Sequence, residues 1–570
     1  MSTTRPAAAA APAEPPVPGT SGGSDASTGS LARSSALMAS GTLVSRLLGF
    51  VRTFAQGAAL GVTTQVGAQT FDVANKVPNV FYMLLAGGVL NAVLVPQIVR
   101  ALKRPDGGEE YVNRLITLTL VLLAGATVLL TLAAPLVVRL YAGSWPPELT
   151  ALATLMAFWC LPQVFFYGLY TVLGQVLNAR GSFGPYMWAP VLNNVVAIAG
   201  LVAFVLIAPD AETWSAGEFD TTSIAVLVGT STLGIVAQAL VLFWPLHRAG
   251  FRYRPRWGLR GTGLRTAGRV AGWTFAAVVV GQLVFVLTSN VATDAGEHLT
   301  RDGLEGATNA SYTPAFLLFM LPHSLVAVSL VTALFTRLSA AAAGGDTAAV
   351  RRDFSRGART VLVAGVLATA ALVALGPWIG VALFGTEGRF VGLVAAAMAV
   401  GLVPFSVTYL VQRVFYAYED ARTPFTVSAT VAAVMAAGDV ACWLLLPARW
   451  TVVGIGAAMS ASNVVGVVLA LVLLRRRLRS LDGRGVDGHR VLRTLVRATI
   501  VGALSGGAAY GLSLLAEPLG PSRAVAVGVV VVGGLVLLAL FTALCRLMRV
   551  HELTDLAAPL LRRLPLPRRR

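Results

Sequence analysis

Long apolar stretches dominate this chain, and they restrict its fold more than any other feature. A helix needs about 20 apolar residues to cross a bilayer, because each residue adds about 1.5 Å and the hydrocarbon core is about 30 Å thick. We count 14 such stretches, at about residues 35–60, 70–101, 112–141, 148–178, 184–208, 221–246, 268–293, 307–336, 357–384, 390–417, 425–447, 451–474, 492–515 and 522–546. The sequence therefore predicts an all-α polytopic membrane protein with about 14 transmembrane helices.

Composition agrees with a membrane protein and argues against nucleic acid as a partner. Only 12% of the residues are charged and 56% are hydrophobic, whereas soluble domains carry about 25% charged residues. The net charge of +18 comes largely from arginines in short loops between apolar stretches, which is the positive-inside pattern of membrane proteins. The three cysteines stand singly in apolar stretches, so we predict neither a metal site nor a disulfide framework.

Loop charge predicts the orientation of the chain. Arginine is frequent in the predicted inner loops 247–267 and 475–491, whereas two predicted outer loops are acidic. The acids of these outer loops are Asp210, Glu212, Glu218, Asp220, Asp294, Glu297, Asp302 and Glu305. With an even number of spans, this asymmetry predicts a multi-pass membrane protein with both termini in the cytoplasm.

An internal repeat divides the chain into two lobes. Pro162 in the fourth stretch and Pro404 in the tenth each interrupt a helix, and a short polar loop with one arginine follows each of them. The offset of about six spans predicts two parallel six-helix lobes related by a pseudo-twofold axis. The predicted divisions are a disordered cytoplasmic tail at 1–33, the N-terminal lobe at 34–247, the C-terminal lobe with a basic linker at 248–475, helices 13 and 14 at 476–547, and a basic cytoplasmic tail at 548–570.

Cationic side chains in the first two spans are the main candidates for a binding site. Arg46 and Arg52 are six residues apart, about 9 Å along a helix and about 120° around it, and Lys76 follows in the second span. Charges at this depth usually face a bundle interior or a wet cavity, so a broad cavity with these cations would suit an anionic, phosphate-bearing substrate. The alternative is that the arginines pair with Asp72 or extend to the interface, and that Lys76 pairs with Asp72 four residues earlier.

Breaks in the second and eighth spans suggest hinges. Pro78, Gly87 and Gly88 interrupt the second span, and Pro322 interrupts the eighth. These spans occupy equivalent places in the two predicted lobes, which indicates a hinge or site between the lobes. Ordinary kinked packing with small residues at helix contacts is the alternative.

Several motifs together resemble the MurJ (MviN) lipid II flippase family, within the superfamily that also holds MATE exporters. They are Ser45-Arg46-x-x-Gly49-Phe50-x-Arg52, Lys76-x-Pro78-Asn79, Asn178-Ala179-Arg180-Gly181-x-Phe183, Pro190-Val191-Leu192-Asn193-Asn194 and Phe415-Tyr416-Ala417-x-x-Asp420-x-Arg422-Thr423-Pro424. The pattern from Tyr312 to Ser324 resembles an actinobacterial version of the eighth helix. The resemblance covers about residues 35–546.

The resemblance implies a substrate and a set of binding residues. It implies a bacterial inner-membrane protein with a cationic central cavity that moves lipid II, or a similar polyprenyl-pyrophosphate glycolipid, to the outer leaflet. Arg46 and Arg52 match the family's cavity arginines, and Lys76 and Asn79 complete the predicted substrate-binding set. Membrane lipids and cell-wall synthesis proteins are the other predicted partners. The chain departs from the family where Gln69, Tyr82-Met83, Phe316-Leu317 and Met320 replace charged residues.

Energy coupling is predicted to use no nucleotide, because the chain has no phosphate-binding GxxxxGK[ST] loop. A lone buried acid in a membrane span is either a cation ligand or hydrogen-bonded to a neighbouring helix, and Asp439 in the eleventh span is such an acid. The resemblance implies a sodium site in this lobe, and Gln282, Thr288 or Asn290 could contribute further oxygens. No resident cofactor is predicted beyond such a coupled monovalent cation.

Four other functions stay open from the sequence. A flippase for a different polyprenyl-linked glycan and a MATE-like small-molecule antiporter share the architecture. A membrane transferase would need clustered acids or histidines; the histidines are scattered and the Glu419-Asp420 pair stands alone, so no catalytic residue is predicted. A non-transporting scaffold for cell-wall synthesis would tolerate the loss of Arg46.

Overall fold

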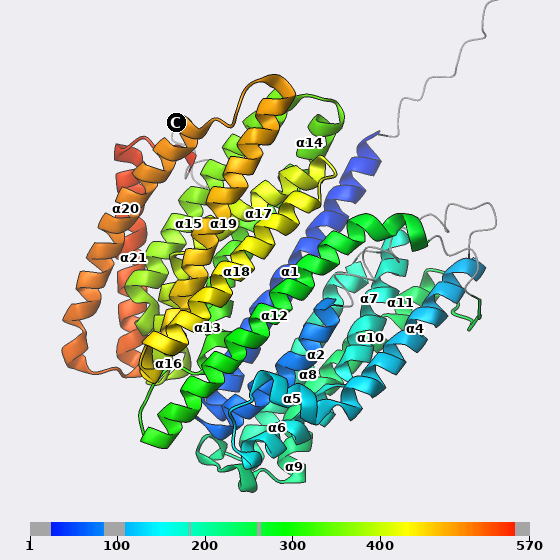
Figure 1. Ribbon diagram of the computed structural model, residues 1–570, viewed down its shortest axis with the longest axis vertical. Helices are drawn as coiled ribbons and strands as arrows, with labels where there is room; N and C mark the ends of the chain where they lie inside the picture. Colours follow the sequence, from blue (N-terminus) through cyan, green and yellow to red (C-terminus); the bar gives the residue numbers. More distant parts are fainter. Residues whose placement is uncertain (1–23, 85–108, 181, 183, 259–263, 553–570) are drawn as a thin grey trace, which may run out of the picture.

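The fold is helical throughout the part that a computed structural model describes, which is residues 24–84, 109–180, 182, 184–258 and 264–552 (Figure 1). In these ranges 11 helices are long and apolar enough to cross a membrane, or up to 12 if the bent pair Gly388–Ala399 and Leu402–Ala417 is one span. The all-α membrane class is thus confirmed, but the number of 14 is not. The two other predicted spans correspond to α1 and to a segment of which α2 is the described part.

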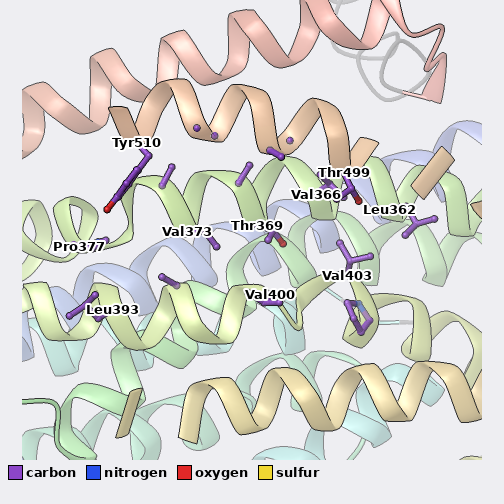
Figure 2. Close-up of a pocket in the computed structure, with 18 of the residues that line it drawn as sticks. Leu362, Val366, Thr369, Val373, Pro377, Leu393, Val400, Val403, Thr499 and Tyr510 are labelled. Carbon is purple, nitrogen blue, oxygen red and sulfur yellow. The ribbon is translucent and has the colours of Figure 1, made fainter. Parts of the chain in front are cut away.

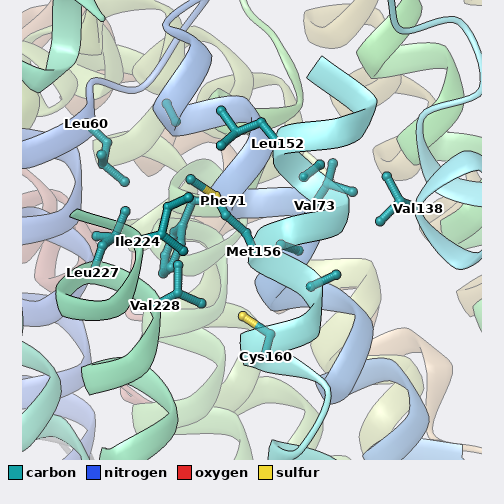
Figure 3. Close-up of a cluster of buried hydrophobic side chains, with 14 of the residues drawn as sticks. Leu60, Phe71, Val73, Val138, Leu152, Met156, Cys160, Ile224, Leu227 and Val228 are labelled. Carbon is teal, nitrogen blue, oxygen red and sulfur yellow. The ribbon is translucent and has the colours of Figure 1, made fainter. Parts of the chain in front are cut away.

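The N-terminal lobe surrounds a core of large apolar side chains. Figure 3 shows Phe71, Met156 and Ile224 meeting there from three different helices. The elements of this lobe are α1 (Ser24–Leu60), α2 (Val66–Leu84), α4 (Glu109–Leu132), α5 (Ala134–Tyr141), α6 (Pro147–Cys160), α7 (Gln163–Ala179), α8 (Gly184–Ile207), α9 (Thr221–Ile224), the π-helix η4 (Ala225–Gly229), α10 (Thr230–Leu240) and α11 (Phe243–Arg248).

The C-terminal lobe follows along the chain and carries two additional helices. Its elements are α12 (Leu264–Asp302), α13 (Asn309–Pro322), the π-helix η5 (His323–Val328), α14 (Ser329–Ala343), α15 (Thr347–Phe384), α16 (Gly388–Ala399), α17 (Leu402–Ala417), α18 (Arg422–Leu445) and α19 (Ala448–Asp482). The additional helices α20 (Gly488–Leu515) and α21 (Arg523–Leu547) pack on α15 and on each other, at the edge of the lobe (Figure 1).

The first helix begins earlier than the sequence predicts. Helix α1 starts at Ser24, so residues 24–33, which we assigned to a disordered tail, are helical. The reason is local, because this stretch has no proline and leads into Ala36-Leu37-Met38-Ala39, which are all good helix formers. The tail residues 1–23 and 553–570 lie outside the described residues.

The repeat is visible as two broken helices. The break between α6 and α7 falls at Leu161 and Pro162, and the break between α16 and α17 falls at Val400 and Gly401, where the axis bends by 51°. Proline lacks an amide hydrogen and its ring collides with the preceding turn, so Pro162 begins a new helix and Pro404 lies in the first turn of α17. Both breaks are where the repeated prolines predict them.

A close contact of glycines holds α16 against α15. Two small-xxx-small pairs face each other, Gly376 with Gly380 and Gly388 with Gly392. A Cβ on Gly380 would lie 1.8 Å from the carbonyl oxygen of Gly388, and a Cβ on Gly392 would lie 2.0 Å from that of Gly376. Only glycine allows two backbones to approach this closely, which is the packing that membrane helices use.

Candidate functional site

A buried ion pair in α2 joins the two lobes. The ammonium Nζ of Lys76 lies 2.5 Å from Asp72 Oδ2, and the two side chains are only 12% and 6% exposed. Lys76 also donates to Asn309 Oδ1 at 2.9 Å, and Thr313 Oγ1 donates to Asp72 Oδ1 at 2.8 Å. Asn309 in turn donates to Ser289 Oγ at 3.1 Å. We call Asp72, Lys76, Ser289, Asn309 and Thr313 the interlobe cluster, because α2 belongs to one lobe and α12 and α13 to the other.

Further hydrogen bonds join the two lobes at the end of the molecule that carries the acidic loops. We call this end the acidic end, and the opposite end, which carries the arginine-rich loops, the basic end. Thr308 and Ser311 at the start of α13 donate to the carbonyl oxygens of Thr63 and Val62, at 2.7 and 2.6 Å. The carboxylate of Glu387 accepts from Thr63 Oγ1 at 2.9 Å and from the Gln65 side chain. These contacts hold the acidic end of the two lobes together.

Arg52 points into the N-terminal lobe. Its Nη2 donates to Ser231 Oγ of α10 at 2.9 Å, and it lies within electrostatic range of Tyr167. The Tyr167 ring stacks on Tyr82 of α2 with centroids 4.8 Å apart. Tyr82 belongs to the pair that replaces a charged residue of the resembled family, so an aromatic stack lies beside the guanidinium in this chain.

Arg46 lies on a different face of α1. Phe50, four residues later, packs on the core of the C-terminal lobe, and a Cβ on Gly57 would meet Phe384 of α15 at 2.7 Å. Arg46 shares this face by helical spacing and lies within electrostatic range of His323 in η5. The two arginines therefore face different lobes, and they lie about 21 and 12 Å from the acidic end of α1.

The backbone structure differs among the predicted hinge positions. Pro78 is buried inside a continuous α2, and Asn79 next to it is exposed. Pro322 ends α13, and the chain continues as the π-helix η5, so the backbone is irregular there as a hinge would require. Gly87 and Gly88 lie outside the described residues.

The candidate ion site brings Asp439 and Thr288 together, whereas the side-chain oxygen of Asn290 accepts from Gly143 N at 3.1 Å. Asp439 of α18 is fully buried, and Thr288 Oγ1 of α12 donates to its Oδ2 at 2.5 Å. Its second oxygen, Oδ1, has no hydrogen-bond partner among the described residues. Gln282 lies on the same helix as Thr288, about 9 Å toward the basic end.

Comparison with known proteins decides the family. The family model described as lipid II flippase MurJ matches residues 57–542. The chain belongs to the MurJ family. A probable lipid II flippase MurJ of Rhizobium meliloti is 27% identical over 90% of this chain and 92% of its own length. The lipid II flippase MurJ of Burkholderia cenocepacia is 28% identical over 68% of this chain and 73% of its own length.

Solved structures share the fold of this MurJ-family protein. A lipid II flippase MurJ in an inward closed conformation matches with a TM-score of 0.67 and 16% identity, covering 90% of this chain and 99% of that one. An inward-facing MATE family multidrug resistance transporter matches with a TM-score of 0.63 and 16% identity, covering 77% of this chain and 96% of that one. Both likenesses show a shared fold, and the family resemblance read from the motifs is confirmed by the family model.

Sequence reasoning missed the partners that hold the cationic side chains. It named Lys76 and its alternative partner Asp72, but not Asn309, Thr313 or Ser231. A signal was present, because Thr308-Asn309-Ala310-Ser311-Tyr312-Thr313 places polar residues at the start of an apolar span. Their partners in α2 could not be inferred, because the pairing spans more than 230 residues of sequence.

We predict that Lys76→Met is more destabilising than the double substitution Asp72→Asn with Lys76→Met. The single change leaves the Asp72 charge buried without its cation, which typically costs about 3–5 kcal/mol, whereas removing both charges is much less costly. Thermal unfolding of the purified variants in detergent measures this difference. A double variant that unfolds as early as Lys76→Met would show that the ion pair is not what matters there.

Proposed function

We propose that this MurJ-family protein moves lipid II, the undecaprenyl-pyrophosphate-linked muropeptide, from the inner to the outer leaflet of the bacterial plasma membrane by alternating access. The observation that carries the proposal is the family match along most of the chain, together with two cations on one helix that face different lobes. The positive-inside pattern of the arginine-rich loops supports a cytoplasmic basic end, and the proposal takes both termini to be cytoplasmic as well.

The charge of the substrate explains the role of the two arginines. A pyrophosphate cannot cross hydrocarbon with its charges bare, and guanidinium groups bind phosphate oxygens through charge-assisted, often bidentate hydrogen bonds. Arg52, held by Ser231, offers a cation on the N-terminal lobe, and Arg46 offers one toward the C-terminal lobe. A pyrophosphate bound between them would draw both lobes onto the substrate while the isoprenoid tail stays in the lipid.

The contacts at the acidic end set the direction of access. Because the interlobe cluster and the Glu387 contacts hold that end together, the substrate enters from the basic, cytoplasmic side. Release requires these contacts to break and the lobes to rock about the site. The substrate drives this change only if it binds better to the rearranged state, which two arginines on different faces of α1 make possible.

The alternatives keep the architecture and change the cargo or the role. A different polyprenyl-linked glycan would use the same phosphate contacts, and a MATE-like antiporter would not need both arginines. In the Glu419-Asp420 pair, which an enzyme could have used, Asp420 has a structural role, because it accepts hydrogen bonds from Thr423 N at 3.0 Å and Thr423 Oγ1 at 2.6 Å. A scaffold for cell-wall proteins would be indifferent to the arginines.

We expect Arg46→Ala and Arg52→Ala each to reduce lipid II flipping by roughly tenfold or more, because a hydrogen bond to a charged group contributes about 1.5–3 kcal/mol. The measurement is exposure of lipid II on the outer leaflet in the depleted host, complemented with each variant. Arg139→Ala is the matched control, since Arg139 is exposed on the short helix α5.

Normal flipping by the double variant Arg46→Ala/Arg52→Ala, at wild-type membrane levels, would contradict the role of these residues. Normal lipid II exposure in cells that lack the protein would instead point to a different lipid-linked cargo. The scaffold alternative predicts full complementation by every arginine variant.

We further propose that Asp439 and Thr288 contribute oxygens to a site for a coupled monovalent cation such as sodium. The support is a fully buried carboxyl group with one oxygen bound to Thr288 and the other without a hydrogen-bond partner in the described part of the chain. Hard cations take several oxygen ligands. Gln282 lies about 9 Å from Thr288 along α12 and would have to move toward Asp439 to serve as a third ligand. Such a site would couple the C-terminal lobe to the ion gradient.

We expect sodium chloride to raise the unfolding temperature of the wild-type protein relative to choline chloride, and Asp439→Asn to abolish this difference. Thr288→Val should reduce it. Asp294→Asn, which alters a partly exposed acid on α12 that accepts from Trp443 Nε1, should retain it. Equal unfolding temperatures of the wild type in the two salts would rule out a sodium site at Asp439.

A further inference from the structure

A basic hollow lies at the basic end of the C-terminal lobe, away from the arginines of α1. Its volume is about 380 Å³, and it is formed by α14, the first turns of α15 and the start of α20. Its walls carry six arginines against two aspartates. The lining residues are Arg337, Arg351, Arg352, Asp353, Ser355, Arg356, Arg359, Asp487 and Arg490, and we call this the basic pocket.

Part of the positive charge of the basic pocket is not neutralised. Arg337 pairs with Asp353 at 2.8 Å, and Arg490 lies 3.5 Å from Asp487. Arg351 and Arg359 are neutralised from outside the lining, by Asp482 and Glu552. Arg352 is exposed and makes no hydrogen bond or ion pair within the described part of the chain. The basic pocket thus keeps the Arg352 cation available for an anion.

A buried hydroxyl in the wall of the basic pocket lacks a partner. Ser355 is only 5% exposed, and its Oγ has no hydrogen-bond partner among the described residues. A buried polar group without a partner costs free energy, and a hydroxyl can donate to a phosphate oxygen. The hydroxyl therefore indicates a ligand with acceptor oxygens. This observation is independent of the positive charge of the basic pocket.

An apolar groove continues from the basic pocket along the same helices. It has a volume of about 1310 Å³ and runs between α15, the α16–α17 pair, α19 and α20. Leu362 on α15 follows Arg359 by three residues, and Val491 on α20 follows Arg490 directly. Figure 2 shows Leu362 and Thr499 at one end of the groove and Tyr510 and Pro377 at the other.

The change from basic to apolar lining is abrupt. On α15 the pocket residues end at Arg359 and the groove residues begin at Leu362, and the two sets lie on one stripe of the helix at spacings of three and four residues. At 38 residues, or about 57 Å, α15 is much longer than the hydrocarbon core is thick. Its first turns therefore lie at headgroup level on the basic side, and the groove lies within the hydrocarbon.

We propose that an anionic phospholipid of the leaflet at the basic end binds here, with its phosphate in the basic pocket and an acyl chain in the groove. Arg352 and the hydroxyl of Ser355 bind the phosphate oxygens, and the groove buries the chain. A soluble phosphate would use the basic pocket alone and leave the groove without a role. This lipid site is separate from the α1 arginines of the proposed function, so either assignment can fail without the other.

The test uses the full-length protein in detergent, with phosphatidylglycerol or phosphatidylcholine added, and measures bound lipid by native mass spectrometry and the unfolding temperature. Arg352→Ala/Arg490→Ala removes two exposed cations from the basic pocket. Arg252→Ala/Arg256→Ala removes two exposed cations from the same end of the N-terminal lobe and is the matched control.

We expect phosphatidylglycerol, but not phosphatidylcholine, to bind tightly to the wild type and to the control variant. The pocket variant should bind it about one order of magnitude more weakly, because basic groups near a membrane surface each contribute substantially to anionic lipid binding. All variants should unfold at the wild-type temperature without lipid, since the substituted side chains are exposed.

A second pair of variants tests the groove. Gly507 lines the groove, and a Cβ there would meet nothing within 4 Å. A Cβ on Gly511, on the same helix but outside the groove lining, would also meet nothing within 4 Å. We expect Gly507→Phe to weaken phosphatidylglycerol binding and Gly511→Phe to leave it unchanged.

Two results would overturn the proposal. Equal binding of phosphatidylglycerol by the pocket variant and its control would show that the basic pocket does not hold the headgroup. If inorganic phosphate raises the unfolding temperature as much as phosphatidylglycerol does, and Gly507→Phe does not change phosphatidylglycerol binding, the basic pocket would be assigned to a soluble anion. Loss of lipid II flipping in the α1 variants, with lipid binding intact, would leave this inference standing.

Discussion

The buried pair of Lys76 and Asp72 is the interaction on which the relation of the two lobes depends. Two opposite charges removed from water gain stability only when the remaining donors and acceptors are satisfied, and here Asn309 and Thr313 supply those bonds from the other lobe. Separation of the lobes at the acidic end therefore exposes the pair to water or forces it to find new partners. The ion pair makes the closed end a discrete state.

The same helix, α1, connects that closed end to the candidate substrate site. Its end at Leu60 leads into the Val62 and Thr63 carbonyl groups that accept from α13, and its middle carries Arg46 and Arg52. Because the two arginines face different lobes, a doubly charged phosphate group between them would contact both sides of the opening. In the proposed mechanism, α1 would link substrate binding to lobe movement, which is the physical requirement for alternating access.

Most of the architecture could be predicted from the sequence, because it depends on local composition. Apolar length located the spans, and Pro162 and Pro404 located the broken helices of the repeat. The start of α1 at Ser24 does not follow from hydrophobicity, which is low there; the absence of proline and the strong helix formers that follow explain it. The site was predicted only in part. The i,i+4 pairing of Lys76 with Asp72 follows from spacing, whereas the bonds from Asn309 and Thr313 depend on tertiary contacts that spacing does not reveal. The divergence of Arg46 and Arg52 agrees with their separation of about 120° on a helix.

The most direct test of this account is the distance between the lobes, measured at both ends by electron spin resonance of spin-label pairs in the full-length protein. Glu212→Cys with Asp302→Cys reports on the acidic end, and Arg252→Cys with Arg337→Cys on the basic end, in a background without the three native cysteines. The account predicts that lipid II adds a population with a longer distance at the acidic end and a shorter one at the basic end. Unchanged distances at both ends during active flipping would contradict it.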